Sequence, residues 1–225
     1  MSYLNPHSTG SDFCVDLMPL ARLRADRPGP DLVQAATVAQ AAGADVISLV
    51  AGEIAPALLT AIASALMIRL HLHLAAGGAS LTEAISVQPH RICLAIDDVS
   101  VAIAQQLHAH GIELALAIDT SVEQVQAAHA AGACAIELDA SKLGAAGIAD
   151  AEFARLVACA AAATRLGMQV QIAHGIDLTN AGRLAALEDV VQIQVGQALL
   201  IRAIIVGWQT AVGEMKAVLT QAGRQ

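Results

Sequence analysis

Eight short apolar runs, each followed by a segment with a helical pattern, restrict the fold of this sequence more than any other feature. The runs that predict strands cover residues 13–17, 45–50, 69–74, 91–96, 113–118, 134–138, 169–173 and 190–195. The segments that predict helices cover residues 31–42, 56–66, 81–87, 99–110, 122–131, 150–166, 179–187, 197–204 and 207–221. This alternation in a chain of 225 residues predicts a single (β/α)8 TIM barrel domain spanning residues 1–225, with an extra short helix after strand eight.

Glycines mark the ends of several predicted helices. Gly43, Gly111, Gly132 and Gly167 each stand shortly before the next strand. Glycine adopts the left-handed conformation that ends a helix without a steric penalty, so these positions agree with short turns between helix and strand. The alternative is an open doubly wound sheet, which would normally have fewer strands and a glycine-rich first turn. No such turn follows Leu17, and this favours the barrel.

Composition restricts both the core and the partners. Hydrophobic residues make up 56% of the chain and aromatic residues 2%, so the core must be built from Ala, Val, Ile and Leu, as in α/β proteins. The net charge of −8 and the scattered Lys and Arg residues offer no basic surface, so we expect no nucleic-acid partner. The sequence shows neither a signal peptide nor an uncharged run long enough for a membrane span. We therefore expect a cytoplasmic protein without membrane contact, with a flexible segment at residues 1–12.

The four cysteines, Cys14, Cys93, Cys134 and Cys159, show neither a CxxC motif nor a metal-binding spacing. Free cysteine is among the most frequently buried residue types. We expect all four to be buried free thiols of a reducing compartment.

Two turns near the end of the chain have the features of a phosphate site. The run 169–173 ends in His174 and Gly175, and the run 190–195 ends in Gly196 and Gln197. In a barrel these turns open on the same face, where their backbone amides converge with the N-terminus of the next helix. We expect Gly175, Gly196 and Gln197 to bind a phosphate group.

Two side chains at the C-terminal ends of predicted strands are suited to acid–base chemistry: Glu137 in the run 134–138 and His174 after the run 169–173. His174 can exchange protons near neutral pH, although a histidine that only caps the loop is the alternative. Glu137, on one face of its strand with Asp139, would be desolvated in the barrel and would need a partner. Lys142, His174 or a ligand ammonium could supply one, and a structural ion pair is the alternative.

His71 and His73 share one face of the third run. Paired histidines can bind a metal, but zinc sites take three or four ligands and no clear third ligand is evident. We therefore expect no metal and no cofactor, and proton transfer or a polar pocket lining is favoured for His73. Arg24 follows the first strand and could hold a phosphate with two hydrogen bonds, although a solvated loop charge is the alternative.

Six blocks that cover most of the chain carry a family resemblance. They are LARLRADRPGPDLVQAATVAQAAGAD, AISVQPHRICLAI, GIELALAID, AGACAIEL, LGMQVQIAHGIDLTN and QIQVGQALLIRAIIVGWQTAVGEMKAVL. Together they resemble the pyridoxine 5′-phosphate synthases of the deoxyxylulose-dependent vitamin B6 pathway. The resemblance implies a homo-oligomeric (β/α)8 barrel, usually an octamer. It also implies a transferase that condenses deoxyxylulose 5-phosphate with 3-amino-2-oxopropyl phosphate and closes a pyridine ring with loss of phosphate and water.

The resemblance also implies roles for individual residues. His174 matches the family's catalytic histidine, and Glu137 matches its glutamate on strand six. Gly175, Gly196 and the amide of Gln197 match phosphate-binding positions, although the family usually has histidine in place of Gln197.

Other positions depart from the family pattern. Arg24 matches an arginine of the first loop, but His73 stands where the family has an acid–base glutamate on strand three. VAGEIAP replaces a histidine-rich segment after strand two, Asp16 and Pro19 replace an Asn and His pattern, and the loop after strand four is short. Two hypotheses follow: a diverged enzyme that acts on a small phosphorylated ketone or amino-ketone, or a non-catalytic homologue that binds a phosphorylated ligand or a partner.

Overall fold

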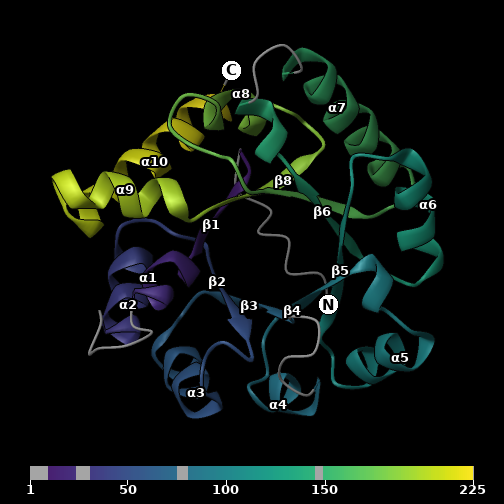
Figure 1. Ribbon diagram of the computed structural model, residues 1–225, viewed down its shortest axis with the longest axis horizontal. Helices are drawn as coiled ribbons and strands as arrows, with labels where there is room; N and C mark the ends of the chain where they lie inside the picture. Colours follow the sequence, from purple (N-terminus) through teal and green to yellow (C-terminus); the bar gives the residue numbers. More distant parts are fainter. Residues whose placement is uncertain (1–9, 24–30, 75–80, 145–148, 225) are drawn as a thin grey trace.

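Eight parallel strands close into a barrel in chain order, with β1 paired to both β2 and β8 (Figure 1). The computed structural model describes residues 10–23, 31–74, 81–144 and 149–224. The strands are β1 Asp12–Asp16, β2 Val46–Ala51, β3 Arg69–Leu74, β4 Arg91–Ala95, β5 Glu113–Ile118, β6 Ala135–Asp139, β7 Gln169–Ala173 and β8 Val190–Val195. The predicted (β/α)8 barrel is confirmed.

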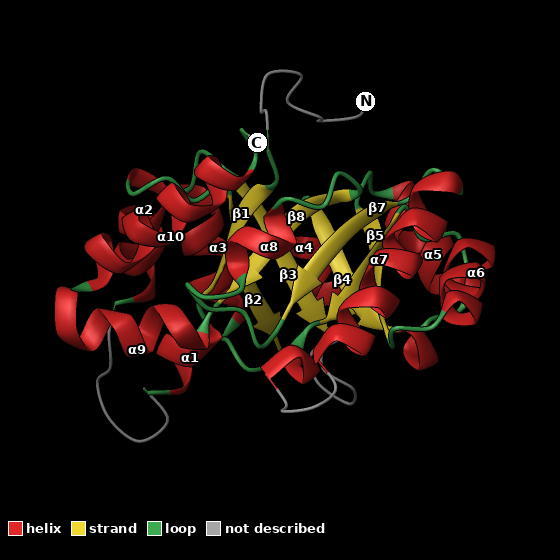
Figure 2. Cartoon of the chain, turned by 90° about the horizontal axis from the view of Figure 1, so that it is seen from above, coloured by secondary structure: helices red, strands yellow, loops and turns green. Residues whose placement is uncertain are grey.

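Helices surround the barrel on its outside (Figures 1 and 2). They are α1 Met18–Arg22, α2 Leu32–Ala41, α3 Pro56–Ala65, α4 Leu81–Ser86, α5 Val101–Ala109, α6 Val122–Ala130, α7 Ala149–Arg165, α8 Ala181–Ala185, α9 Gln197–Val206 and α10 Trp208–Ala222. Short 3-10 turns follow β4 at Ile96–Asp98 and β6 at Ser141–Gly144. α9 and α10 confirm the extra helix after strand eight, and among the described segments no helix is long and apolar enough to cross a membrane.

The predicted strands agree with the structure to within one residue at either end. The helix that the sequence did not predict is α1, a five-residue element with Pro19 in its first turn. An Asp16 carboxylate oxygen accepts a hydrogen bond from the Met18 amide at 2.9 Å, which holds the start of this helix against the end of β1. Asp12 already belongs to β1, and residues 1–9 of the predicted flexible segment lie outside the described residues.

The main apolar core lies between the strands and the helices. Outward-facing strand residues such as Phe13, Ile47 and Leu72 are fully buried there and pack in one continuous cluster with the alanine-rich helices. Alternate residues of each strand point into the barrel, and many of these are polar. The inside of the barrel therefore differs in chemistry from its apolar outer layer.

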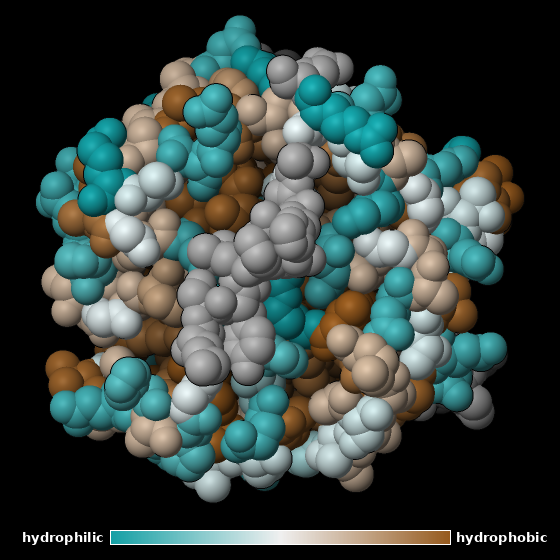
Figure 3. Space-filling model, turned by 180° about the vertical axis from the view of Figure 1, so that it is seen from behind, coloured by the Kyte–Doolittle hydropathy of each residue, from teal (hydrophilic) through white to brown (hydrophobic). Residues whose placement is uncertain are grey.

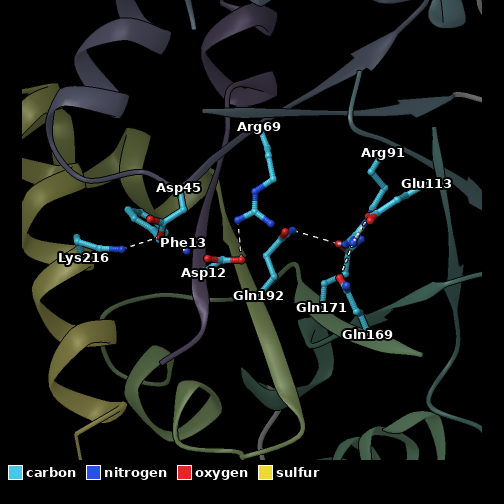
Figure 4. A network of polar contacts seen from close by, with 10 residues as sticks. All are labelled: Asp12, Phe13, Asp45, Arg69, Arg91, Glu113, Gln169, Gln171, Gln192 and Lys216. Atoms are coloured by element: carbon cyan, nitrogen blue, oxygen red, sulfur yellow. Dashed lines mark hydrogen bonds and ion pairs between the residues drawn. The ribbon is translucent and has the colours of Figure 1, made fainter. Parts of the chain in front are cut away.

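A polar network fills the end of the barrel where the strands begin (Figure 4). Arg91, only 2% exposed, donates from Nε to Glu113 Oε2 at 3.0 Å and from Nη1 to Gln171 Oε1 at 3.1 Å. Gln192 also donates to Gln171 Oε1 at 3.1 Å. Because these partners come from β4, β5, β7 and β8, the network fixes the strands relative to one another across the interior.

The C-terminal helices close one side of the molecule. The Trp208 indole N–H donates to the Ala35 carbonyl at 2.9 Å and joins α10 to α2. Lys216 on α10 pairs with Asp45 at 2.6 Å, next to the start of β2 (Figure 4). α9 and α1 lie side by side at one end of the barrel (Figure 2). From behind, hydrophilic residues lie near the centre of the face and are interspersed with hydrophobic ones around its rim (Figure 3).

The cysteine prediction is confirmed at three positions and wrong at one. Cys14, Cys93 and Cys159 are buried free thiols, whereas Cys134 is free but exposed. The sixth strand begins at Ala135, one residue later than predicted, so Cys134 lies in the preceding turn. Its thiol donates to the Leu114 carbonyl at 3.3 Å.

Candidate active site

A cavity of about 770 Å³ opens at the C-terminal ends of the strands, on the side covered by α1, α9 and α10. Its lining includes five of the residues that sequence reasoning selected, His73, His174, Gly175, Gly196 and Gln197. Asp16, at the end of β1, also lines it. Arg24, the remaining predicted phosphate-binding residue, lies outside the described residues. The barrel mouth thus brings together side chains from β1, β3, β7 and β8, as the fold class predicts.

Glu137 lies inside the barrel with only 3% of its side chain exposed. Its Oε2 accepts a hydrogen bond from Gln171 Nε2 at 2.9 Å. Two imidazoles approach it from the mouth: His73 Nε2 is 3.6 Å from Oε2, and His174 Nε2 is 4.0 Å from Oε1. The buried carboxylate therefore has two proton-carrying groups within ion-pair distance.

The other predicted partners of this carboxylate lie elsewhere. Lys142 is exposed in the turn after β6 and forms no ion pair with Glu137 in the part of the chain described. Asp139 is also exposed, and its Oδ1 accepts from the Ser141 amide at 2.7 Å. Alternation predicts that Asp139 lies on the same face of the strand as Glu137. In the structure Asp139 instead stabilises the turn after the strand through this hydrogen bond.

His174 has a left-handed backbone conformation, with φ at 63°. Positive φ is uncommon outside glycine and costs conformational energy, so it is often associated with functional positions. The following residue, Gly175, also has a positive φ of 60°, and its carbonyl accepts from Asn180 Nδ2 at 2.9 Å. These constraints turn the imidazole, which is 57% exposed, toward the cavity and Glu137.

Gly175 is required by packing as well as by its conformation. A Cβ at this position would lie 2.6 Å from Ser141 Cα and 3.0 Å from the Ala140 carbonyl oxygen. The turn after β7 therefore contacts the backbone of the turn after β6. Packing against Ser141 is therefore one reason why this position is a glycine. The sequence itself predicts a different reason, namely close approach of a phosphate group to the backbone.

Gly196 has a similar neighbour on β1. A Cβ here would lie 2.8 Å from Asp16 Oδ2, so the Asp16 carboxyl fills the space beside the glycine. Burial raises the pKa of Asp16, opposed by the Met18 amide and by the charges of His73 and His174. Asp16 thus places an acidic group directly beside the turn that the sequence predicts to hold a phosphate.

The described arginines near the cavity are both paired with glutamates. Arg22 forms two hydrogen bonds with Glu53, at 3.0 and 3.1 Å. Arg202 on α9 forms two with Glu214 on α10, at 2.7 and 2.9 Å. A phosphate that recruits either guanidinium would compete with its carboxylate partner.

His71 and His73 occupy the same face of β3 but have different surroundings. His71 is 3% exposed, and burial together with Arg91 and Arg69 lowers its pKa well below the usual value. His73 lies one step closer to the mouth and is 20% exposed. His73 is therefore the histidine of the pair that can meet a ligand.

Cys93, like Asp16, is a site residue that the sequence analysis did not select. Its Sγ lies within 4.8 Å of ligand atoms of His73 and Glu137, from the neighbouring β3 and from β6. Burial, with the nearby Glu137 charge, raises the pKa of this thiol well above its usual value. The available signal was alternation, since Cys93 has the same phase on β4 as the inward-facing Arg91.

Comparison with known proteins places the chain in a family. Residues 95–221, more than half of the chain, match the sequence profile of the family described as pyridoxal phosphate biosynthesis protein PdxJ. The fold is similar to phosphoribosylanthranilate isomerase from Thermotoga maritima, with a TM-score of 0.63 and 11% identity over 93% of this chain and 98% of that chain. It is also similar to tryptophan synthase from Mycobacterium tuberculosis, with a TM-score of 0.68 and 14% identity over 94% and 93% of the chains. These two likenesses concern the barrel alone. The profile match runs from the end of β4 into α10 and includes Glu137, His174 and Gly196. Because it covers more than half of the chain, the chain belongs to the PdxJ family of pyridoxal phosphate biosynthesis proteins.

Proposed function

We propose that this chain is a pyridoxine 5′-phosphate synthase-like enzyme that acts on a small phosphorylated ketone or amino-ketone by acid–base condensation. The observation that carries the proposal is the position of Glu137, a buried carboxylate within 4.0 Å of His73 and His174 at the mouth of the cavity. Groups that exchange protons near neutral pH, held together in a partly enclosed site, are what such chemistry needs.

His174 is the main proton carrier in this proposal. Condensation of an amine with a ketone requires a proton on the carbonyl oxygen as it leaves as water, and later removal of a proton from carbon. His174 faces the cavity from its constrained turn, and His73 lines the same cavity from β3. Glu137 lies 3.6 Å from His73 Nε2 and 4.0 Å from His174 Nε2, and in this proposal its carboxylate orients the two rings.

The phosphate of the substrate has a place at the N-terminus of α9. Gly196 precedes this ten-residue helix, and no side chain caps its first amides. Free amides at a helix N-terminus favour an anion. The cavity volume of about 770 Å³ lies within the range of about 300–1,000 Å³ that is usual for small-molecule sites.

The proposal is tested by incubating the purified protein with deoxyxylulose 5-phosphate and 3-amino-2-oxopropyl phosphate. Pyridoxine 5′-phosphate is measured by chromatography, and release of inorganic phosphate is measured in parallel. We expect turnover by the native chain, and a loss of at least about 100-fold in the His174→Asn variant, the scale of a lost acid–base group. His129→Asn, which changes an exposed histidine on α6, serves as the control and should keep full activity.

Two results would contradict the enzyme proposal. Equal turnover in the His174→Asn and native chains would remove the histidine from the chemistry. Thermal stabilisation by either phosphorylated substrate with no product from any pairing of phosphorylated ketones and amino-ketones would support the non-catalytic, ligand-binding alternative.

A further inference from the structure

Three different donor groups meet just below the mouth of the barrel. His73 on β3, Cys93 on β4 and Glu137 on β6 each offer one ligand atom, and these atoms all lie within 4.8 Å of one another. We propose that they form a binding site for one divalent transition-metal ion, with zinc as the preferred occupant. No third ligand is evident beside the paired histidines in the sequence, whereas the closed barrel brings Cys93 and Glu137 to His73.

The donor set selects the class of metal. A thiolate, an imidazole and a carboxylate together suit zinc or cobalt, whereas magnesium and calcium prefer oxygen donors throughout. Around a tetrahedral zinc ion, neighbouring N, O and S ligands lie about 3.3–3.7 Å apart. His73 Nε2 and Glu137 Oε2 are already 3.6 Å apart, so modest side-chain rotations complete the coordination.

Charge and burial favour a cation at this position. Glu137 is 3% exposed and Cys93 is 2% exposed, and alanine residues of β5 and β6 pack against the thiol. When a divalent ion binds, the Cys93 S–H bond breaks, a sulfur–metal bond forms and the proton passes to solvent. The thiolate and the carboxylate then carry two negative charges, which match the charge of the ion in an environment that penalises an unbalanced charge.

The carboxylate is held in place from below. Gln171 Nε2 donates to Glu137 Oε2 at 2.9 Å, and Gln171 is in turn held by Arg91 and Gln192 through its own carbonyl oxygen. Such outer partners orient ligating carboxylates in metal sites. The polar network at the base of the barrel therefore presents Glu137 to the other two ligands.

The remaining coordination position faces the cavity. His73 lines the cavity, while Cys93 and Glu137 lie beneath it. Three protein ligands with one open position are the arrangement of catalytic rather than structural zinc sites. The proposal goes beyond the reaction proposed above. A bound ion would replace the direct pairing of His73 with Glu137, and His174 would remain the group that carries protons.

Cobalt binding by the full, untagged chain tests the site without relying on activity. After treatment with a chelator, the protein is titrated with Co²⁺ while the visible and near-ultraviolet spectra are recorded. We expect one equivalent to bind with a thiolate-to-cobalt charge-transfer band, and Zn²⁺ to displace it. In Cys93→Ser the band should vanish and the affinity for Co²⁺ should fall at least about tenfold, equivalent to about 1.4 kcal/mol.

Matched cysteine variants separate this site from other thiols. Cys14→Ser changes another thiol buried inside the barrel, and Cys134→Ser removes the exposed one. Both should keep the band and the affinity. His73→Gln, at the partly exposed rim, should weaken cobalt binding while the circular dichroism spectrum stays native.

Three outcomes would overturn the proposal. They are the absence of any cobalt band in the native chain, a band that persists in Cys93→Ser, and a band lost in Cys134→Ser. Metal binding in a chain that shows no synthase turnover would support the site and count against the proposed reaction. Turnover in a chain that binds neither cobalt nor zinc would support the proposed reaction and contradict the metal site.

Discussion

Gln171 connects the two polar regions of the barrel interior through a single side chain. Its amide N–H donates to Glu137 at the mouth, and its carbonyl oxygen accepts from Arg91 and Gln192 at the base. All four side chains are nearly inaccessible to solvent. A buried polar group that loses its partner costs about 1–3 kcal/mol, so the hydrogen bond from Gln171 helps to hold the carboxylate in position.

We expect Gln171→Met to lower the free energy of unfolding by about 2–3 kcal/mol, since it removes the hydrogen bonds that Gln171 makes with Arg91, Gln192 and Glu137 in the buried interior. Urea denaturation followed by circular dichroism measures the change. Gln126→Met on the exposed side of α6 is the matched substitution and should change stability by less than about 0.5 kcal/mol. Equal effects at the two positions would show that the network contributes little.

The raised pKa of Asp16 predicts that the free energy of unfolding depends on pH. Its pKa is raised by burial, so ionisation is more costly in the folded chain than in the unfolded chain. The folded state is therefore favoured by this group at low pH, and the advantage is lost as the pH rises through the raised pKa. Asp16→Asn removes the ionisation and keeps an oxygen that accepts from the Met18 amide.

We expect Asp16→Asn to be more stable than the native chain at pH 7, and the difference to shrink as the pH is lowered toward the acid range. Denaturant midpoints measured at a series of pH values check this. A constant difference at every pH would mean that ionisation of Asp16 does not contribute. Lower stability of the variant at pH 7 would mean that the carboxylate is favourably paired in the folded chain.

At the scale of elements, the turns after β6 and β7 set the geometry of the mouth. The close approach of Gly175 to Ser141 joins them, and the left-handed φ at His174 aims the imidazole inward. Both effects follow from the backbone. The arrangement should therefore tolerate changes of exposed side chains better than the addition of one methyl group at Gly175.

Comparing Gly175→Ala with Gly132→Ala separates sterics from conformation. Both glycines have a positive φ, but a Cβ at Gly132 would meet nothing within 4 Å. We expect Gly132→Ala to cost about 1 kcal/mol for the left-handed conformation. Gly175→Ala should cost about 1–3 kcal/mol more because the methyl group overlaps Ser141. Thermal and denaturant unfolding measure both, and equal losses would refute the packing argument.

At the scale of the whole molecule, polar contacts inside the barrel accompany an apolar layer outside it. Arg91 alone joins β4 to β5 and β7 through Glu113, Gln169 and Gln171. These hydrogen bonds link β4 to its neighbour β5 and, across the interior, to β7. Buried polar networks specify such an arrangement more selectively than apolar contacts do. The base of the barrel therefore fixes the register, while the opposite end carries the site.

We expect Arg91→Met to destabilise the protein by about 3 kcal/mol, because it leaves the Glu113 carboxylate and two glutamine side chains without their shared partner. Arg165→Met, at the exposed end of α7, is the control and should cost less than about 0.5 kcal/mol. Chemical denaturation gives both values. A loss below about 1 kcal/mol for Arg91→Met would mean that the network can rearrange around the missing guanidinium.

Much of this architecture could be predicted from the sequence because strand and helix alternation is a local signal. The strands are found to within one residue, and five of the predicted site residues line one cavity. α1 was missed because five residues with an early proline show no helical period. The Asp16 contact with Gly196 was missed because it depends on barrel closure, which joins β1 to β8. Alternation predicts that Cys93 points inward, but its proximity to Glu137 on β6 follows only from the closed barrel.

The contact between Gly175 and Ser141 has a consequence for motion as well as for stability. Because the backbone at Gly175 leaves no room for a Cβ beside Ser141, we expect a displacement of the Ser141–Gly144 turn to displace the peptide that carries His174 as well. The two turns should then fluctuate together, with matching exchange rates in nuclear magnetic resonance relaxation experiments on their amides. A ligand that restricts the motion of the turn after β6 would therefore also restrict the orientations of the His174 imidazole at the end of the neighbouring strand β7.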